Sequence, residues 1–169
     1  MKRMFGTQIR SMTDQDWDSV CSIYRDGVST GLATFETQLP SWTEWSGSHL
    51  PAPRLVATDG EQVVGWAALG PVSSRSVYAG VAEVSVYVAR DRRGGGIGKG
   101  LLGRLVAESE KTMIWTLQAS VFPENAASIA IHKSCGFREV GRRERIGNLS
   151  GTWRDTILLE RRSKLVGSD

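Results

Sequence analysis

The chain has 169 residues, of which 40% are hydrophobic and 23% are charged, and its formal net charge is +3 at pH 7. This composition excludes collagen-like, coiled-coil and largely disordered proteins, and it predicts a single domain over residues 1–169 with a core at about 4–162. The arginines are scattered among acidic residues and form no basic stripe. We therefore expect an anionic small molecule, and not nucleic acid, as the partner.

We also expect neither a membrane or secreted protein nor one held together by disulfides or a metal. No segment approaches the roughly 18 apolar residues of a membrane span, and the first residues lack the apolar stretch of a signal peptide. Cys21 and Cys135 show neither disulfide nor metal-ligand spacing, so we expect buried free thiols and no metal. A cytoplasmic, reduced protein that contacts no membrane is the resulting prediction.

The first half of the chain predicts a strand, a helix and a β-hairpin. Thr13 followed by acidic residues marks a helix start, Trp17 and Tyr24 follow at helical spacing, and Gly27 is expected near the helix end. An Asp-Gly dipeptide marks the hairpin turn. The expected elements are a strand at about 2–10, a helix from 13 to about 27, a short helix at 41–49, and strands at 54–58 and 63–69.

The second half predicts strands that alternate with helices. Alternating β-branched residues indicate a strand before a glycine-rich segment, and an apolar helical pattern follows that segment. Gly136 is expected to end a later helix. The expected elements are a loop at 71–76, a strand at 77–89, a helix after the glycines, a strand at 113–121, a helix at 124–135, and strands at 140–146 and 153–160.

The segment from Arg93 to Gly100 holds the glycines that join this strand to its helix. Backbone N–H groups at a helix start are unpaired and partially positive, and glycine lets the backbone approach an anion closely. Together with Lys99, the segment predicts a pyrophosphate cradle, although a plain glycine-rich turn explains the glycines equally well. The spacing fits neither a P-loop nor a dinucleotide-binding fingerprint, because Gly100 and Lys99 occupy positions that those motifs reserve for Ser/Thr and Gly.

Two motifs in this half of the chain resemble the GCN5-related N-acetyltransferase (GNAT) superfamily. Arg93-Gly94-Gly95-Gly96-Ile97-Gly98 matches its Arg/Gln-x-x-Gly-x-Gly/Ala signature, placed after a strand and opening a helix. Asn125, His132 and the Gly136-Phe137 pair resemble its second signature. Within the superfamily, the phosphinothricin and methionine sulfoximine acetyltransferases are the most similar group, on the likeness of residues 82–88 to their fourth strand.

This resemblance implies the GNAT fold: an α/β architecture with a central mixed, mostly antiparallel twisted sheet of about seven strands, flanked by about four helices. It implies that the fourth strand bulges and splays from the fifth, so that the pantetheine arm of acetyl-CoA pairs with the exposed backbone. It also implies a homodimer, for which Trp42 and Trp45 are compatible interface residues.

The resemblance further implies which residues contact acetyl-CoA. The strand would bind the arm through its main chain and hold the thioester carbonyl with a backbone N–H. The glycine segment would bind the pyrophosphate, and an asparagine on the next helix would contact the arm. The implied cofactor-binding residues are Val86, Tyr87, Val88, Arg93, Gly94, Gly96, Ile97, Gly98, Lys99 and Asn125.

Two residues are candidates for proton transfer. Glu83 is the candidate general base, because the attacking amine must be neutral. An acid among the apolar residues of a packed strand is also costly to bury unless it has a function. The alternative is a surface glutamate without a role. His132 stands where many relatives carry tyrosine and is the candidate to protonate the thiolate or assist the base. The alternative for His132 is a structural hydrogen bond.

The acceptor is expected to be the primary amine of a small amino-acid-like molecule of the phosphinothricin, methionine sulfoximine or methionine sulfone type. Arg75 is the candidate partner of its carboxylate, while Phe35, Glu36 and Tyr78 are candidate pocket residues. An exposed loop arginine and core aromatics are the alternatives. Two other functions stay open: acetylation of a protein N-terminus or lysine, and a non-catalytic acyl-CoA-binding module.

Overall fold

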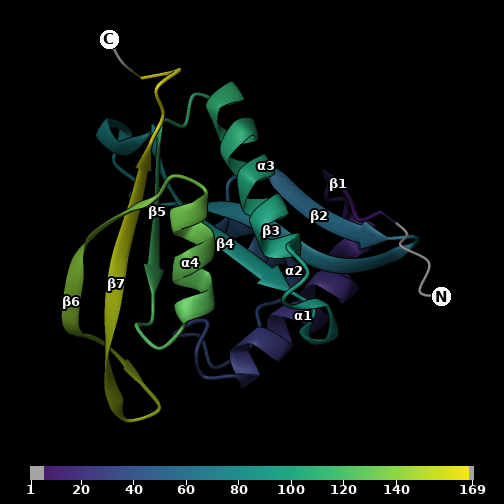
Figure 1. Ribbon diagram of the computed structural model, residues 1–169, viewed down its shortest axis with the longest axis horizontal. Helices are drawn as coiled ribbons and strands as arrows, with labels where there is room; N and C mark the ends of the chain where they lie inside the picture. The colour runs from purple at the N-terminus through teal and green to yellow at the C-terminus, as the bar shows by residue number, and fades with distance from the viewer. Residues whose placement is uncertain (1–5, 168–169) are drawn as a thin grey trace.

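The computed structural model describes residues 6–167. A seven-stranded sheet has the order β1-β2-β3-β4-β5-β7-β6, and within the described residues four α-helices flank it (Figure 1). Neighbouring strands are antiparallel except β4 and β5, which are parallel. The expected GNAT sheet of seven strands and four helices is confirmed.

The elements alternate along the chain much as the sequence pattern predicts. The strands are β1 (Gln8–Ser11), β2 (Arg54–Asp59), β3 (Gln62–Pro71), β4 (Val81–Val88), β5 (Thr116–Val121), β6 (Arg138–Leu149) and β7 (Thr152–Arg162). The helices are α1 (Trp17–Ser29), α2 (Trp42–Ser48), α3 (Ile97–Lys111) and α4 (Ala126–Ser134).

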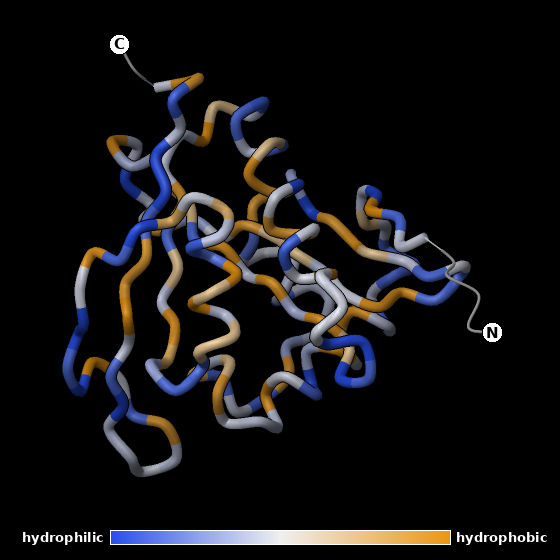
Figure 2. The backbone as a smooth tube through the Cα atoms, in the orientation of Figure 1, coloured by the Kyte–Doolittle hydropathy of each residue, from blue (hydrophilic) through white to orange (hydrophobic). Residues whose placement is uncertain are grey.

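Each face of the sheet carries its own hydrophobic core. On one face Leu101 and Leu105 of α3 pack against the strands, and α4 lies beside α3. On the other face α1 and α2 cover Trp66, with Trp45 buried against it. Figure 1 shows the two helix pairs on opposite sides of the sheet, and in Figure 2 the outer strand β6 is coloured mainly as hydrophilic. Trp45 is only 1% exposed, so its predicted place in an exposed interface is wrong.

Several element boundaries differ from the prediction. The first strand begins at Gln8, and the part expected at residues 2–5 lies outside the described residues. Helix α1 continues past Gly27, whose missing side chain makes room for the Tyr87 ring: a Cβ there would lie 2.6 Å from it. The strand expected from residue 77 begins at Val81, because Ser76–Tyr78 form a 3₁₀ turn. The ends of the later strands differ from the prediction by at most three residues.

Strands β4 and β5 separate soon after they begin to pair. Pairing covers only Val81–Glu83 against Thr116–Gln118, although both strands continue further. The expected splay is therefore present, and we call the opening between the two strands the β4–β5 mouth. The expected bulge in the fourth strand is wrong: β4 pairs with β3 in an unbroken register.

Candidate active site

The edge of β4 that faces the β4–β5 mouth carries free backbone groups. Antiparallel ladders direct alternate residues toward the partner strand, and the N–H of Ala89 donates to the carbonyl of Val64 in β3. In that alternation Tyr87 bonds to β3, whereas Val86 and Val88 face the mouth. The Arg93 Nε, which donates to the Val88 carbonyl at 3.3 Å, lies at the same open edge. Of the three residues expected to pair with the cofactor arm, Tyr87 is thus directed elsewhere.

The glycine segment ends at an open helix N-terminus. Gly94 and Gly96 have φ angles of 78° and 84°, which residues with a Cβ rarely adopt. Gly96 is the N-cap of α3, and no side chain caps it, so the first N–H groups of the helix are available to an anion. Lys99 is exposed beside them. This geometry fits a pyrophosphate.

Glu83 lies on the face of the sheet opposite α3. Its neighbours Ala82 and Val84 are buried in the core under α3, and strand alternation therefore directs Glu83 to the other face. Its carboxylate accepts a hydrogen bond of 3.1 Å from Gln118 Nε2. Gln118 is its pairing partner at the last rung before the β4–β5 mouth opens. Glu83 is exposed and so is not an acid buried within a packed sheet, which was the sequence argument for its role.

His132 is 5% exposed and lies inside the last turns of α4. Its Nδ1 is 2.7 Å from the Ser128 carbonyl, which can only accept, so Nδ1 carries the proton. Its ring packs edge-on against Phe137. Burial lowers the pKa of the imidazole below its usual value, while the Ser128 carbonyl opposes that shift. The neutral ring therefore serves the helix as a structural hydrogen-bonding residue; its predicted proton transfer stays a prediction.

Asn125 joins α4 to the segment that follows α1. Its Oδ1 accepts the N–H of Ser128 at 3.2 Å and so caps α4, while its Nδ2 donates to the Leu32 carbonyl at 3.1 Å. The second bond ties the segment after α1 to the N-terminus of α4.

That segment carries the predicted acceptor-binding residues Phe35 and Glu36, and we call residues 34–37 the acceptor loop. Phe35 packs edge-on against Phe122 at the end of β5, with ring centroids 4.9 Å apart. The negative charge of Glu36 acts on the hydroxyls of Tyr24 and Tyr87. Burial raises the pKa of both hydroxyls above the ordinary value, and the charge of Glu36 adds to the shift.

Arg75 and Tyr78 lie together before β4. The Arg75 guanidinium is 5.7 Å from the centre of the Tyr78 ring, and both residues are exposed. Neither residue lines the cavity beside the acceptor loop. That cavity, of about 470 Å³, is lined by Val28, Ser29, Gly31, Glu36, Thr37, Leu149, Ser150, Thr152 and Arg154.

The β6–β7 hairpin contributes residues to this region that the sequence analysis did not single out. Between Arg143 and Gly147, strand β6 holds two more residues than the facing stretch of β7. The Asp155 carboxylate stabilises this bulge, because it accepts from the Arg145 N–H at 2.7 Å and from Arg142 Nε at 2.8 Å. The only signal in the sequence was the clustering of arginines at 142–145.

Comparison with known proteins decides the family. Residues 17–137 match the Acetyltransferase (GNAT) family. The chain belongs to the GNAT family. It is an N-acetyltransferase.

Two curated relatives of this GNAT protein cover most of its length. It is 35% identical to a phosphinothricin N-acetyltransferase of Alcaligenes faecalis, over 90% of this chain and 81% of the relative. It is 30% identical to an L-methionine sulfoximine/L-methionine sulfone acetyltransferase of Pseudomonas paraeruginosa, over 92% and 94%.

Solved structures of GNAT proteins also superpose closely on the chain. A phosphinothricin acetyltransferase from Sinorhizobium meliloti in complex with acetyl-CoA has a TM-score of 0.86 and 29% identity, over 96% of this chain and 91% of that one. A ribosomal-protein-alanine N-acetyltransferase from Brucella melitensis has a TM-score of 0.84 and 35% identity, over 92% and 99%.

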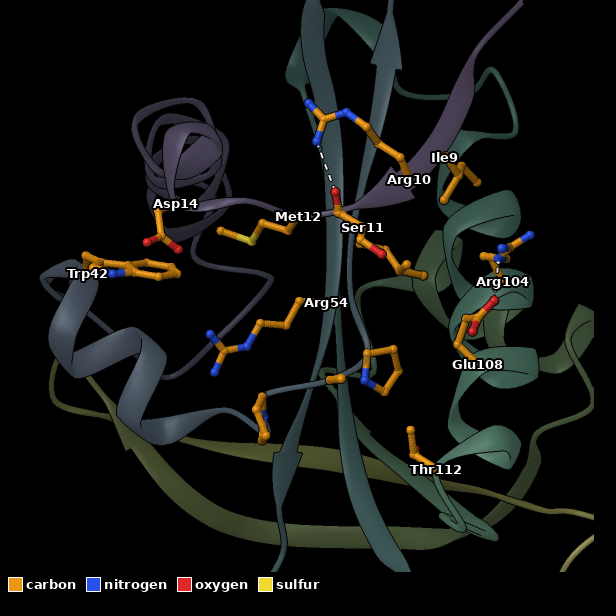
Figure 3. Close-up of a pocket in the computed structure, with 14 residues that line it drawn as sticks. Ile9, Arg10, Ser11, Met12, Asp14, Trp42, Arg54, Arg104, Glu108 and Thr112 are labelled. Atoms are coloured by element: carbon orange, nitrogen blue, oxygen red, sulfur yellow. Dashed lines mark hydrogen bonds and ion pairs between the residues drawn. The ribbon is translucent and has the colours of Figure 1, made fainter.

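A second cavity of this GNAT protein, of about 380 Å³, lies at the β1 edge of the sheet, away from the β4–β5 mouth (Figure 3). Three arginines line it. Arg10 pairs with Asp16 at 2.8 Å and Arg104 with Glu108 at 2.9 Å, whereas the guanidinium of Arg54 donates to backbone carbonyls, among them that of Leu50 at 2.7 Å. It is not the cofactor site, because β2 and β3 separate it from β4.

Residues 6–167 contain neither a metal-ligand cluster nor a membrane-spanning helix. Among residues 6–167, no group of three or more His, Cys, Asp or Glu side chains is arranged to hold a metal ion. Within the same range, every helix is too short or too polar to cross a membrane.

Proposed function

We propose that the protein transfers the acetyl group of acetyl-CoA to the primary amine of a small amino-acid-like molecule of the phosphinothricin, methionine sulfoximine or methionine sulfone type. The observation that carries this proposal is the position of Glu83, at the last rung of the β4–β5 mouth and on the face opposite α3. The named activities of the two curated relatives support the acceptor class.

The open edge and the glycine segment fit acetyl-CoA, which supplies an acetyl group activated as a thioester. The N-terminus of α3 and its glycines would hold the pyrophosphate, with charge from Arg93 and Lys99. The open-edge backbone of Val86 and the N–H of Val88 would pair with the arm as an added strand does, while the Val88 carbonyl accepts from Arg93. The full set proposed for the pyrophosphate is Arg93, Gly94, Gly96, Ile97, Gly98 and Lys99, and Asn125 is proposed to contact the arm.

The reaction requires a neutral amine and a stabilised oxyanion. Glu83 takes a proton from the acceptor ammonium, directly or through a water, so that the nitrogen lone pair can attack the thioester carbon. The C–N bond forms, the C–S bond breaks, and CoA leaves as the thiolate, which takes up the second proton that the nitrogen loses. The Val86 N–H, at the open edge, donates to the thioester oxygen and stabilises the charge that develops there. The acceptor approaches from the Glu83 face, because α3 and the pyrophosphate site occupy the other face. No acyl-enzyme is needed, and Cys135 has no role.

The acceptor loop and the hairpin form the walls around the acceptor. Phe35 and Glu36 are proposed to line one wall, with Arg75 and Tyr78 as candidates at the entrance before β4. The predicted cytoplasmic homodimer stays a prediction. Exposed apolar side chains on the hairpin, such as Trp153 at 54% and Ile146 at 50%, are compatible with it.

A protein N-terminus is the second candidate acceptor, favoured by the ribosomal-protein-alanine N-acetyltransferase among the similar structures. The first experiment therefore measures release of the CoA thiol with a panel of acceptors: phosphinothricin, methionine sulfoximine, methionine sulfone, ordinary amino acids, polyamines and short peptides. Saturable release with the amino-acid analogues would support the proposal. Activity with peptides alone would replace it with the second function, and tight acetyl-CoA binding with no release would favour a binding module.

A further inference from the structure

A row of polar side chains crosses the sheet on the Glu83 face. Glu83 pairs with Gln118, and Gln118 pairs with Glu160, which in turn pairs with Arg138 on β6. Arg138 bonds Glu160 at 2.7 Å, so this rung has one unmatched acid, Glu83. The alternation along β5 places Ser120 on the same face, one step beyond Gln118 toward the β4–β5 mouth.

Arg143 reaches Ser120 from the far strand of the sheet. Its guanidinium donates to Ser120 Oγ at 2.6 Å, which carries the side chain from β6 across β7 to β5. Because Ser120 and Gln118 lie on one face, the guanidinium lies on the face that carries Glu83. Within the described part of the chain no carboxylate lies within 4.0 Å of it, whereas Arg142 and Arg138 of the same strand have acidic partners.

The bulge in β6 explains why this arginine is placed without a partner. Asp155 engages Arg142 and the backbone of Arg145, and the chain between them turns through a φ of 49° at Arg145. Arg143 follows Arg142 and therefore projects to the opposite face, away from Asp155. A serine hydroxyl leaves most of the guanidinium's five N–H donors free, and their fork matches a carboxylate.

We propose that Arg143, oriented by Ser120, binds the carboxylate of the acceptor while Glu83 faces its amine. This inference rests on the proposed function. Residues i and i+2 of a strand are about 7 Å apart. Gln118 contacts Glu83, and Ser120 contacts the Arg143 guanidinium. The two charged groups are therefore close enough for one α-amino acid to reach both, with its ammonium on Glu83 and its carboxylate on Arg143. Arg75 was the sequence candidate for this role, but its guanidinium rests over the Tyr78 ring in the segment before β4.

The test compares Arg143→Ala with two matched variants. Arg145→Asn removes the same charge from the same hairpin and keeps a residue that tolerates positive φ; Arg75→Ala removes the rival arginine. Each variant is assayed for thiol release with methionine sulfoximine and with its carboxamide, which keeps the amine and lacks the carboxylate. We expect Arg143→Ala to raise the acceptor KM about 10- to 100-fold, with the KM for acetyl-CoA within about twofold of the parent.

The carboxamide supplies the diagnostic comparison. If Arg143 binds the carboxylate, the parent enzyme loses affinity for the carboxamide, and Arg143→Ala loses little more. An equal loss on both acceptors, or a loss confined to Arg75→Ala, overturns the assignment while acetyl transfer to the amino acid stands. A parent enzyme that acetylates no amino-acid analogue overturns the proposed function itself. Circular dichroism melting of Arg143→Ala separates misfolding from lost binding, and Arg143→Lys should recover part of the affinity.

Discussion

The ring of Phe35 rests on the bare α-carbon of Gly147. A Cβ at Gly147 would lie 2.6 Å from Phe35 Cζ, closer than real contacts allow. Phe35 of the acceptor loop is thus packed where Gly147 follows the β6 bulge, and the same ring packs edge-on against Phe122.

Gly147→Ala should displace the acceptor loop. We expect a loss of about 1–3 kcal/mol in the free energy of unfolding from overpacking and an acceptor KM raised several-fold, with acetyl-CoA affinity little changed. Gly141→Ala is the matched control, since a Cβ at Gly141 meets no atom within 4 Å. Phe35→Leu added to Gly147→Ala should restore part of the stability measured by urea denaturation. Equal stability and equal acceptor KM in the two alanine variants would contradict the packing of Phe35 against Gly147.

Glu83→Gln should reduce turnover without weakening cofactor binding. Removal of a general base costs about 10²- to 10⁴-fold in kcat, whereas the amide preserves the shape of the side chain. Glu160→Gln is the control on the same rung and should stay within about twofold of the parent. Stopped-flow or steady-state thiol release measures both. Unchanged turnover in Glu83→Gln would remove this residue from the mechanism.

Gly96→Val should weaken acetyl-CoA binding, because valine disfavours the φ of 84° that shapes the segment before α3. Gly95→Ala is the control: its φ is not positive and the nearest atom to a Cβ there is 3.6 Å away. Titration calorimetry with acetyl-CoA should show at least a tenfold rise in Kd for Gly96→Val alone. If both variants bind as the parent does, the cradle is not at this segment.

The stability of the fold should fall in mildly acidic solution. Burial lowers the pKa of both His49 and His132 from the ordinary value of about 6.5. As the pH falls below 6.5 the unfolded chain takes up protons that the folded chain resists, so the free energy of unfolding decreases, by at most about 1.4 kcal/mol per pH unit for each histidine. Urea denaturation between pH 7.5 and 5.5 measures the slope. His132→Gln should reduce that slope, and an unchanged slope would contradict the burial argument for His132.

Local patterns predicted the parts of the fold whose contacts are close in sequence. The strand β4, the glycine segment and the helix α3 are consecutive in the chain. Glycines between a strand pattern and a helix pattern therefore predict both the positive φ angles and the uncapped helix N-terminus. The face that Glu83 occupies also follows from alternation alone. The solvent exposure of Glu83 could not be predicted in this way, because alternation does not say whether a helix covers that face.

What the sequence by itself determined was thus the family, the order of elements and the glycine loop that opens α3, since each depends on neighbours a few residues apart. Only the tertiary structure decided which side chains meet at the acceptor side. Phe35 and Gly147 are far apart in the chain, and Arg143 reaches Ser120 because β7 lies between β6 and β5 and a two-residue bulge reorients β6. Strand periodicity specifies a face but not a partner strand, because the period of two is the same for every arrangement of strands in the sheet.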